Sequence, residues 1–80
     1  PTDAEAGFGT AQLFRHCIIH SDGKLCWKHN SFLKVYYEHF CKKYPIAKVE
    51  ENDILCLSIS DVIFPLIEEC KSYINQKNKT

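Results

Sequence analysis

Residues 30–45 read NSFLKVYYEHFCKKYP, and this stretch decides the fold more than any other part of the chain. Lys34, Glu38 and Lys42 recur every four residues, so a helix would place them together on its solvent-facing side. The side chains between them are mostly apolar or aromatic and recur at helical spacing. The pattern predicts an amphipathic helix. Its expected inner face consists of Phe32, Leu33, Tyr36, Tyr37, Phe40, Cys41 and Tyr44.

The two ends of this helix follow from local chemistry. The side chain of Asn30 or Ser31 can accept a hydrogen bond from one of the free N–H groups in the first turn. Pro45 lacks a backbone N–H and prevents continuation, so we expect the helix to end at Tyr44.

Two further helices are predicted, one on each side of the first. The earlier one begins at Thr10 as its N-cap, continues to about His20, and is stopped by Gly23, which tolerates a positive φ. The later one has Ser60 as a natural cap and contains Pro65, so either the helix kinks at Pro65 or it begins there, with Pro65 at its first position. The expected core residues are Leu13, Phe14, Cys17 and Ile18 in the earlier helix, and Ile63, Leu66, Ile67, Cys70, Tyr73 and Ile74 in the later one.

Two short apolar pieces are ambiguous in the sequence. Residues 25–27 fit a brief strand or a buried connector, and residues 54–59 fit a strand or a short helix, because periodicity does not separate these states. We therefore predict a mainly α fold, a compact bundle of three to four helices. If both pieces are strands and pair, the domain becomes α+β with a winged-helix-like outline.

The length of the chain, 80 residues, allows one small domain. We expect residues 1–9 to be a flexible lead-in, residues 10–75 to form a single globular domain, and residues 76–80 to be a frayed polar tail. The chain does not begin with Met, so we expect it to be part of a larger protein.

Cysteine usage indicates the compartment. Five cysteines is an odd number, whereas a secreted disulfide framework favours an even one. Free cysteines pack as small apolar residues, so we expect free thiols and an intracellular protein, either cytoplasmic or nuclear. No apolar run is long enough to span a bilayer, and we expect no membrane partner.

One set of residues has the chemistry of a zinc site. His16 and His20 are one helical turn apart, and Cys26 and His29 follow within ten residues, so these four side chains could complete a tetrahedral site. The spacing is not that of a standard zinc finger, and we expect His16 and His20 to lie on the polar edge of their helix instead. A small zinc-stabilised domain is a minor alternative, and our preferred expectation includes no metal and no cofactor.

The sequence offers no positioned catalytic machinery. His39 and Cys41 diverge on a helix because they are only two residues apart. The three glycines do not form a phosphate-binding loop. We therefore expect a non-catalytic protein without a small-molecule substrate.

Charge is zero overall but unevenly distributed. Residues 15–48 carry seven Lys or Arg against two carboxylates, and residues 49–70 carry six carboxylates and no Lys or Arg. The basic middle segment, residues 24–48, is interleaved with aromatics, which is typical of nucleic-acid-binding domains. This function is our alternative, with Lys24, Lys28, Lys43 and Lys48 as phosphate contacts.

Our preferred function is protein interaction. So small a core cannot cover every aromatic ring, and exposed aromatics beside charge are common interface anchors. We expect Trp27 and Phe64 to contact another protein, together with the four lysines named above.

Overall fold

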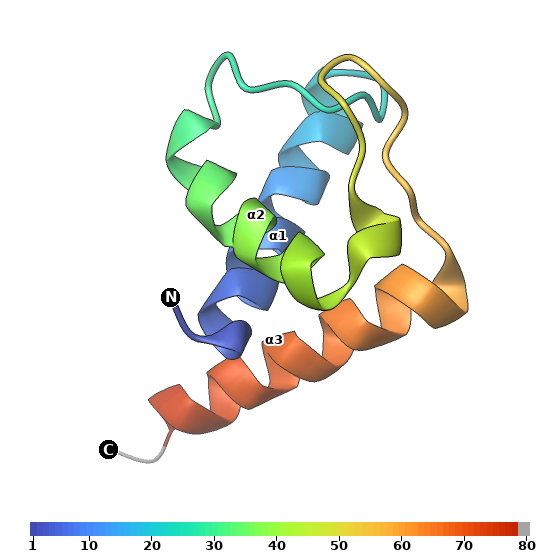
Figure 1. The fold of residues 1–80 in the computed structure, drawn as a ribbon. Helices are drawn as coiled ribbons and strands as arrows, with labels where there is room; N and C mark the ends of the chain where they lie inside the picture. The colour runs from blue at the N-terminus through green and yellow to red at the C-terminus, as the bar shows by residue number, and fades with distance from the viewer. Residues whose placement is uncertain (79–80) are drawn as a thin grey trace.

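Within residues 1–78, three α-helices and three shorter helical segments follow one another (Figure 1). The structure is a computed structural model, and it describes residues 1–78. The predicted mainly α class is confirmed. The strand pairing is limited, within the described residues, to one antiparallel bridge between Lys24 and Ile54, so the winged-helix alternative gains no support. The helical segments are α1 (Asp3–His20), η1 (Ser31–Leu33), α2 (Lys34–Lys43), η2 (Pro45–Ala47), η3 (Ile59–Ile63) and α3 (Phe64–Lys77).

Helix α1 begins at Asp3, so the start predicted at Thr10 is wrong, and residues 3–9 are helical rather than a flexible lead-in. Thr2 is the N-cap: its hydroxyl accepts from the Glu5 N–H at 3.1 Å, and the Thr2 N–H donates to the Glu5 carboxylate at 2.8 Å. This reciprocal capping box satisfies two free donors of the first turn. Thr10 instead lies within the helix, where its hydroxyl is buried and has no hydrogen-bond partner among the described residues.

Gly7 and Gly9 are the reason that the start of α1 is hard to predict, because glycine disfavours helix interiors. In the structure they allow close helix crossings. A Cβ on Gly7 would lie 2.2 Å from Cβ of Glu69 in α3, and a Cβ on Gly9 would lie 2.6 Å from Cβ of Tyr36 in α2. The two missing side chains therefore let one helix pack directly against both of the others.

Helix α2 buries part of the aromatic face that the sequence predicts. Tyr37, Phe40 and Cys41 are buried, whereas Phe32 in η1 is 70% exposed. The predicted side-chain cap is wrong as well, because the Asn30 amide turns back and donates to the Cys26 carbonyl at 3.2 Å.

Residues 54–59 form neither the expected strand nor an α-helix. After the bridge at Ile54 the chain is extended, and a π-helical turn, η3, then leads directly into α3. Ser58, rather than Ser60, caps this turn by accepting from the Asp61 N–H at 3.4 Å. Pro65 is the second residue of α3, directly after the π-helical turn η3.

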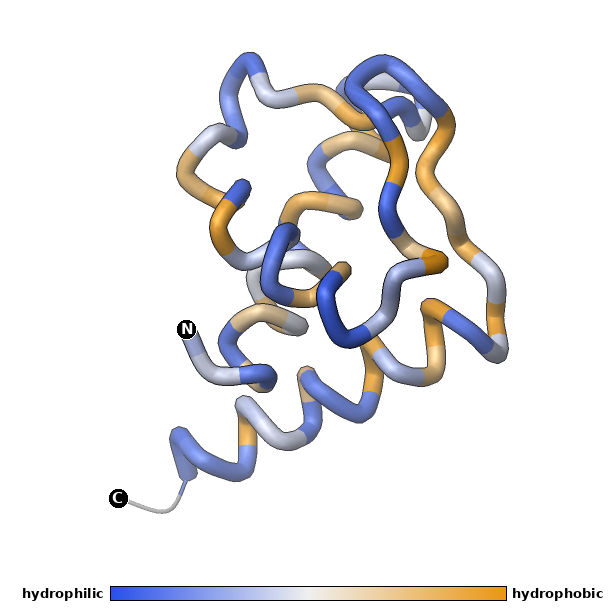
Figure 2. The backbone as a smooth tube through the Cα atoms, in the orientation of Figure 1, coloured by the Kyte–Doolittle hydropathy of each residue, from blue (hydrophilic) through white to orange (hydrophobic). Residues whose placement is uncertain are grey.

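Helix α3 lies along one side of the molecule and packs against α1 and η3 (Figure 1). Val62 and Leu66 face the core, whereas Ile67, which we expected there, is 44% exposed. Figure 2 shows apolar residues both in the connection before η3 and along α3, so apolar character alone does not identify its inner face.

The remaining predictions concern the ends of the chain. The polar tail expected at 76–80 overlaps α3, which extends to Lys77, and residues 79–80 lie outside the described residues. Within the described part, no helix has the length and apolar character needed to cross a bilayer.

Candidate functional site

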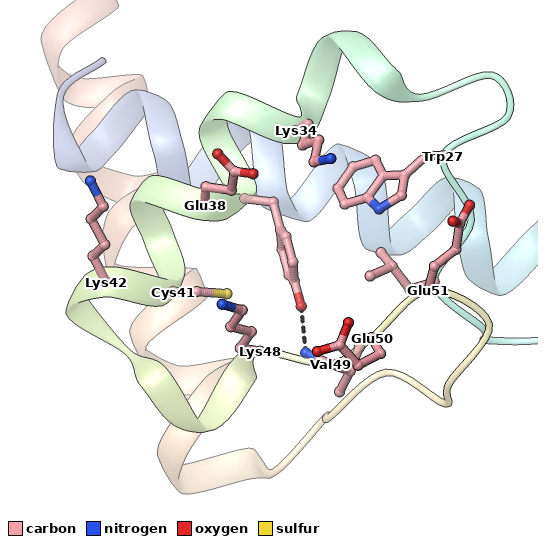
Figure 3. A pocket seen from close by; sticks show the side chains of 11 residues that line it. Trp27, Lys34, Glu38, Cys41, Lys42, Lys48, Val49, Glu50 and Glu51 are labelled. Atoms are coloured by element: carbon pink, nitrogen blue, oxygen red, sulfur yellow. Dashed lines mark hydrogen bonds between the residues drawn. The ribbon is translucent and has the colours of Figure 1, made fainter.

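A groove of about 480 Å³ lies between α2 and the segment 48–51 that follows η2 (Figure 3). We call it the α2 groove. Leu25 and Trp27, from the connection after α1, complete its wall, so three separate parts of the chain build it. Its lining residues are Leu25, Trp27, Lys34, Tyr37, Glu38, Cys41, Lys42, Lys48, Val49, Glu50 and Glu51.

Tyr37 fixes the shape of the groove. Its hydroxyl accepts from the Val49 N–H at 2.8 Å, drawn as a dashed line in Figure 3, and donates to the Ala47 carbonyl at 3.2 Å. Burial of the ring raises the pKa of the phenol well above its ordinary value, so it stays protonated and can donate. One side chain thereby ties the segment after η2 to α2.

The connection that supplies Leu25 is also held in place. The Leu25 N–H donates to the Asp53 carbonyl at 2.9 Å, and the Asn52 N–H donates to the Leu25 carbonyl at 2.8 Å. Gly23, as predicted, adopts a positive φ of 78°, which turns the chain from α1 into this connection. The groove is therefore a fixed feature of the backbone rather than a gap between loose loops.

Trp27 forms the aromatic end of the groove. Its ring meets that of Tyr37 edge to face, with centroids 5.6 Å apart. The Lys34 ammonium lies 5.8 Å from the Trp27 ring centroid, and Figure 3 shows the two side chains pointing toward each other. Trp27 is only half-buried, so part of its ring is available to a partner.

The rim of the groove carries both signs of charge in equal number. The cations are Lys34, Lys42 and Lys48, and the carboxylates are Glu38, Glu50 and Glu51. A phosphate backbone would meet three carboxylates here, whereas a polypeptide segment with both signs would find complementary groups. The charged rim and the aromatic rings of Trp27 and Tyr37 together resemble the usual composition of a protein interface.

Cys41 lines the groove but lacks the character of a nucleophile. Burial raises the pKa of its thiol above the ordinary value, which keeps it in the less reactive protonated form. All five cysteines are free thiols in the structure. Burial also raises the pKa of the Cys17 and Cys70 thiols.

The structure separates the predicted partner-binding residues into several places. Trp27 and Lys48 line the α2 groove, and Lys24 and Lys28 are exposed on the connection that leads through Trp27. Phe64 lies at the start of α3, outside the groove, and is 57% exposed. Lys43 belongs to an ion-pair network, so these six residues do not form one surface.

That network joins the three α-helices. Asp3 in α1 accepts from His39 at 2.8 Å and from Lys43 at 3.1 Å, and Lys43 also contacts the largely buried carboxylate of Glu69 in α3 at 3.2 Å. The hydrogen bond from His39, followed by that from Lys43, lowers the pKa of Asp3. Lys43 is thus a structural residue here rather than a free phosphate contact.

The four candidate zinc ligands do not come together as a site. His16 and His20 are neighbours, with ring centroids 4.6 Å apart, as their spacing predicts. Among residues 1–78, however, no group of three or more His, Cys, Asp or Glu side chains is arranged to hold a metal ion. The zinc-stabilised alternative therefore has no geometric support.

Sequence reasoning missed half of the groove. From the sequence, Lys34, Glu38 and Lys42 are expected only on the solvent-facing side of a helix, and Glu50 and Glu51 only within an acidic part of the chain. One signal was available in the sequence. Pro45 ends the helix, and only a few residues separate it from Glu50 and Glu51, so these carboxylates must lie near the charged face of the helix.

Comparison of the chain with protein-family models, with curated proteins and with solved structures gives no match.

Proposed function

We propose that this chain is a non-catalytic protein-interaction module of a larger intracellular protein, and that the α2 groove holds a segment of the partner. The observation that carries the proposal is the combination of a half-buried Trp27 with a rim of three lysines and three glutamates. Aromatic anchors supply most of the energy at protein interfaces, and charged rims set specificity and orientation.

The chemistry of the groove indicates the kind of partner. An apolar or aromatic side chain would pack against Trp27 and Val49, while flanking residues of both signs would meet the lysines and glutamates. A segment of mixed charge with a central apolar residue is the best match. The intracellular placement is supported by the free thiols, of which Cys17 and Cys41 are buried.

Binding of single-stranded nucleic acid is the second candidate. It is favoured by Lys24 and Lys28, which are both exposed and lie close to Trp27 in the sequence, one on each side. It is disfavoured by the three carboxylates on the groove rim and by the engagement of Lys43 with Asp3 and Glu69.

The test is selection of peptides from a random display library, followed by fluorescence titration of the best binders. Trp27 is the chain's only tryptophan, so its emission reports occupancy of the groove directly. Lys48→Glu should weaken binding of the selected peptides roughly tenfold, because it removes a rim cation and adds a repulsive carboxylate. Arg15→Glu is the matched control on the exposed side of α1, and it should bind as the unmodified chain does.

Equal binding by the Lys48→Glu and Arg15→Glu variants would contradict the proposal, as would a library that yields no peptide. Titration of a single-stranded oligonucleotide at several salt concentrations addresses the second candidate. Affinity that falls steeply with salt, and is lost in the variant with both Lys24→Glu and Lys28→Glu, would favour nucleic acid instead.

A further inference from the structure

Helix α3 exposes three large apolar side chains along its outer side. Phe64 is 57% exposed, Ile67 44% and Ile74 53%. Ile67 lies one turn after Phe64, and Ile74 lies two turns after Ile67, so the three share one side of the helix, with Lys71 in the turn between the two isoleucines. We call this set the α3 stripe. Exposed apolar residues gathered on one face of a helix and flanked by charge often mark a site of association.

The α3 stripe is not needed for the fold of the single chain. Leu66 and Glu69 are the buried residues of α3, and Phe8 in α1 stacks on Tyr73 with ring centroids 4.3 Å apart. Figure 1 shows α1 and α2 on the same side of α3, which leaves the opposite side of this helix uncovered. The stripe is therefore a surface without a partner inside the described chain.

The charges within the stripe identify what would cover it. Glu68 and Lys71 are both exposed and lie 3.7 Å apart, between Ile67 and Ile74 in the sequence. Along the sequence, the midpoint between Glu68 and Lys71 coincides to within one residue with the midpoint between Phe64 and Ile74. A second α3, laid antiparallel across this point, would bring Phe64 against Ile74 of the other copy and Glu68 against Lys71 of the other copy.

We propose that the α3 stripe binds a second copy of this chain, with the two α3 helices antiparallel around a two-fold axis. A two-fold interface requires a surface that complements itself, and the order Phe64, Glu68, Lys71, Ile74 has this property. Each contact then occurs twice. Ile67 lies beside the axis, where it packs on its own counterpart and on the aliphatic stem of Lys71. This dimer leaves the α2 groove free and does not depend on its function.

Sedimentation equilibrium over a range of concentrations tests the proposal. The unmodified chain should reach twice the monomer mass, and Ile67→Glu should remain monomeric, because it places two carboxylates at the axis. Ile19→Glu is the matched control: Ile19 is 58% exposed on α1, away from the stripe, and this variant should dimerise normally. Circular dichroism should show that both variants keep their helices, so that loss of dimer is not loss of fold.

A charge-exchange experiment tests the antiparallel register. Glu68→Lys and Lys71→Glu should each weaken dimerisation roughly threefold to thirtyfold, because each puts like charges opposite one another twice. An equal mixture of the two variants should dimerise better than either alone, since opposite charges then meet across the interface. Within each chain the two charges remain alike, so this recovery cannot arise from the pair inside α3.

Two results would overturn the proposal. A chain that stays monomeric at every concentration has no such interface. A dimer that is unaffected by Ile67→Glu, or that shows no recovery on mixing, is built on another surface.

Discussion

The inner faces of α2 and α3 differ in what they bury. Helix α2 buries Tyr37, Phe40 and Cys41, the residues that its sequence pattern marks as apolar, whereas α3 leaves Phe64, Ile67 and Ile74 largely outside. The two helices differ in the elements that pack against them. Helix α2 packs against α1, η1 and η2 and against the connection carrying Leu25. Helix α3 packs against α1 and η3, and it reaches α2 only through the ion pair between Lys43 and Glu69 among the described residues.

The crossing between α1 and α3 explains which side chains α3 can bury. Gly7 lets the two backbones approach until Glu69 occupies the space that a Cβ of residue 7 would need. So close a crossing leaves little room for large side chains between the helices. A helix with more apolar residues than its inner face can hold must expose some of them, and these are then available for a partner.

The largest effect should come from the core of α2. Phe40→Ala removes a ring that is 1% exposed and should lower the free energy of unfolding by roughly 3–5 kcal/mol, which is enough to unfold much of so small a domain. Ile67→Ala should cost less than about 1 kcal/mol in the monomer. Urea denaturation of both variants, at concentrations where the chain is monomeric, provides the measurement. Similar losses of unfolding free energy in the two variants would contradict the proposed difference between α2 and α3.

A smaller effect is expected at the crossing of α1 and α3. Gly7→Ala should destabilise the fold by roughly 1–3 kcal/mol, because the new Cβ requires a shift of the helices. The intrinsic preference of Ala over Gly in a helix acts in the opposite direction, by about 1 kcal/mol. Thermal unfolding monitored by circular dichroism gives the sign. If Gly7→Ala raises the melting temperature, the close approach of α1 and α3 is wrong.

The hydroxyl of Tyr37 should matter more than other hydroxyls near it. Tyr37→Phe leaves the Val49 N–H without its acceptor and should cost roughly 1–3 kcal/mol. Tyr44→Phe is the matched control, because that ring packs on Phe40 from the end of the same helix. Hydrogen exchange at Val49 should accelerate in the first variant and not in the second. An unchanged exchange rate would show that Tyr37 does not hold the groove wall.

The smallest effect concerns pH. His39 and Lys43 lower the pKa of Asp3 in the folded chain, so the Asp3 carboxylate contributes stability above its ordinary pKa. That contribution is lost as pH falls through the lowered pKa, in the range below about pH 4. Asp3→Asn should therefore show a flatter loss of stability on acidification. Parallel acid titrations of the two proteins would contradict this role of Asp3.

The sequence specifies α2 well because its aromatic residues are many and Pro45 stops it. It specifies α1 poorly, because the small residues Gly7 and Gly9 indicate a loop unless their helix partners are known. The Thr2 to Glu5 capping box was a readable signal for the true start of α1.

The inner face of α3 was not predictable for a related reason. Ile67 and Leu66 are equally apolar and adjacent, and the rotation that buries Leu66 is set by the contact between Gly7 and Glu69. The α2 groove likewise depends on the fold of residues 45–51, which no periodic pattern describes. Trp27 and Lys48 were predicted as partner contacts, but their position on one groove becomes visible only in three dimensions.

The most direct test of the central claim is a map of backbone amide chemical shifts in the isotope-labelled chain, recorded while a display-selected peptide is added. We expect the largest changes at Trp27, along Lys34–Lys42 and along residues 48–51, with residues 64–74 unchanged. Changes concentrated on α3, or spread evenly over the chain, would contradict the assignment of the α2 groove as the partner-binding site.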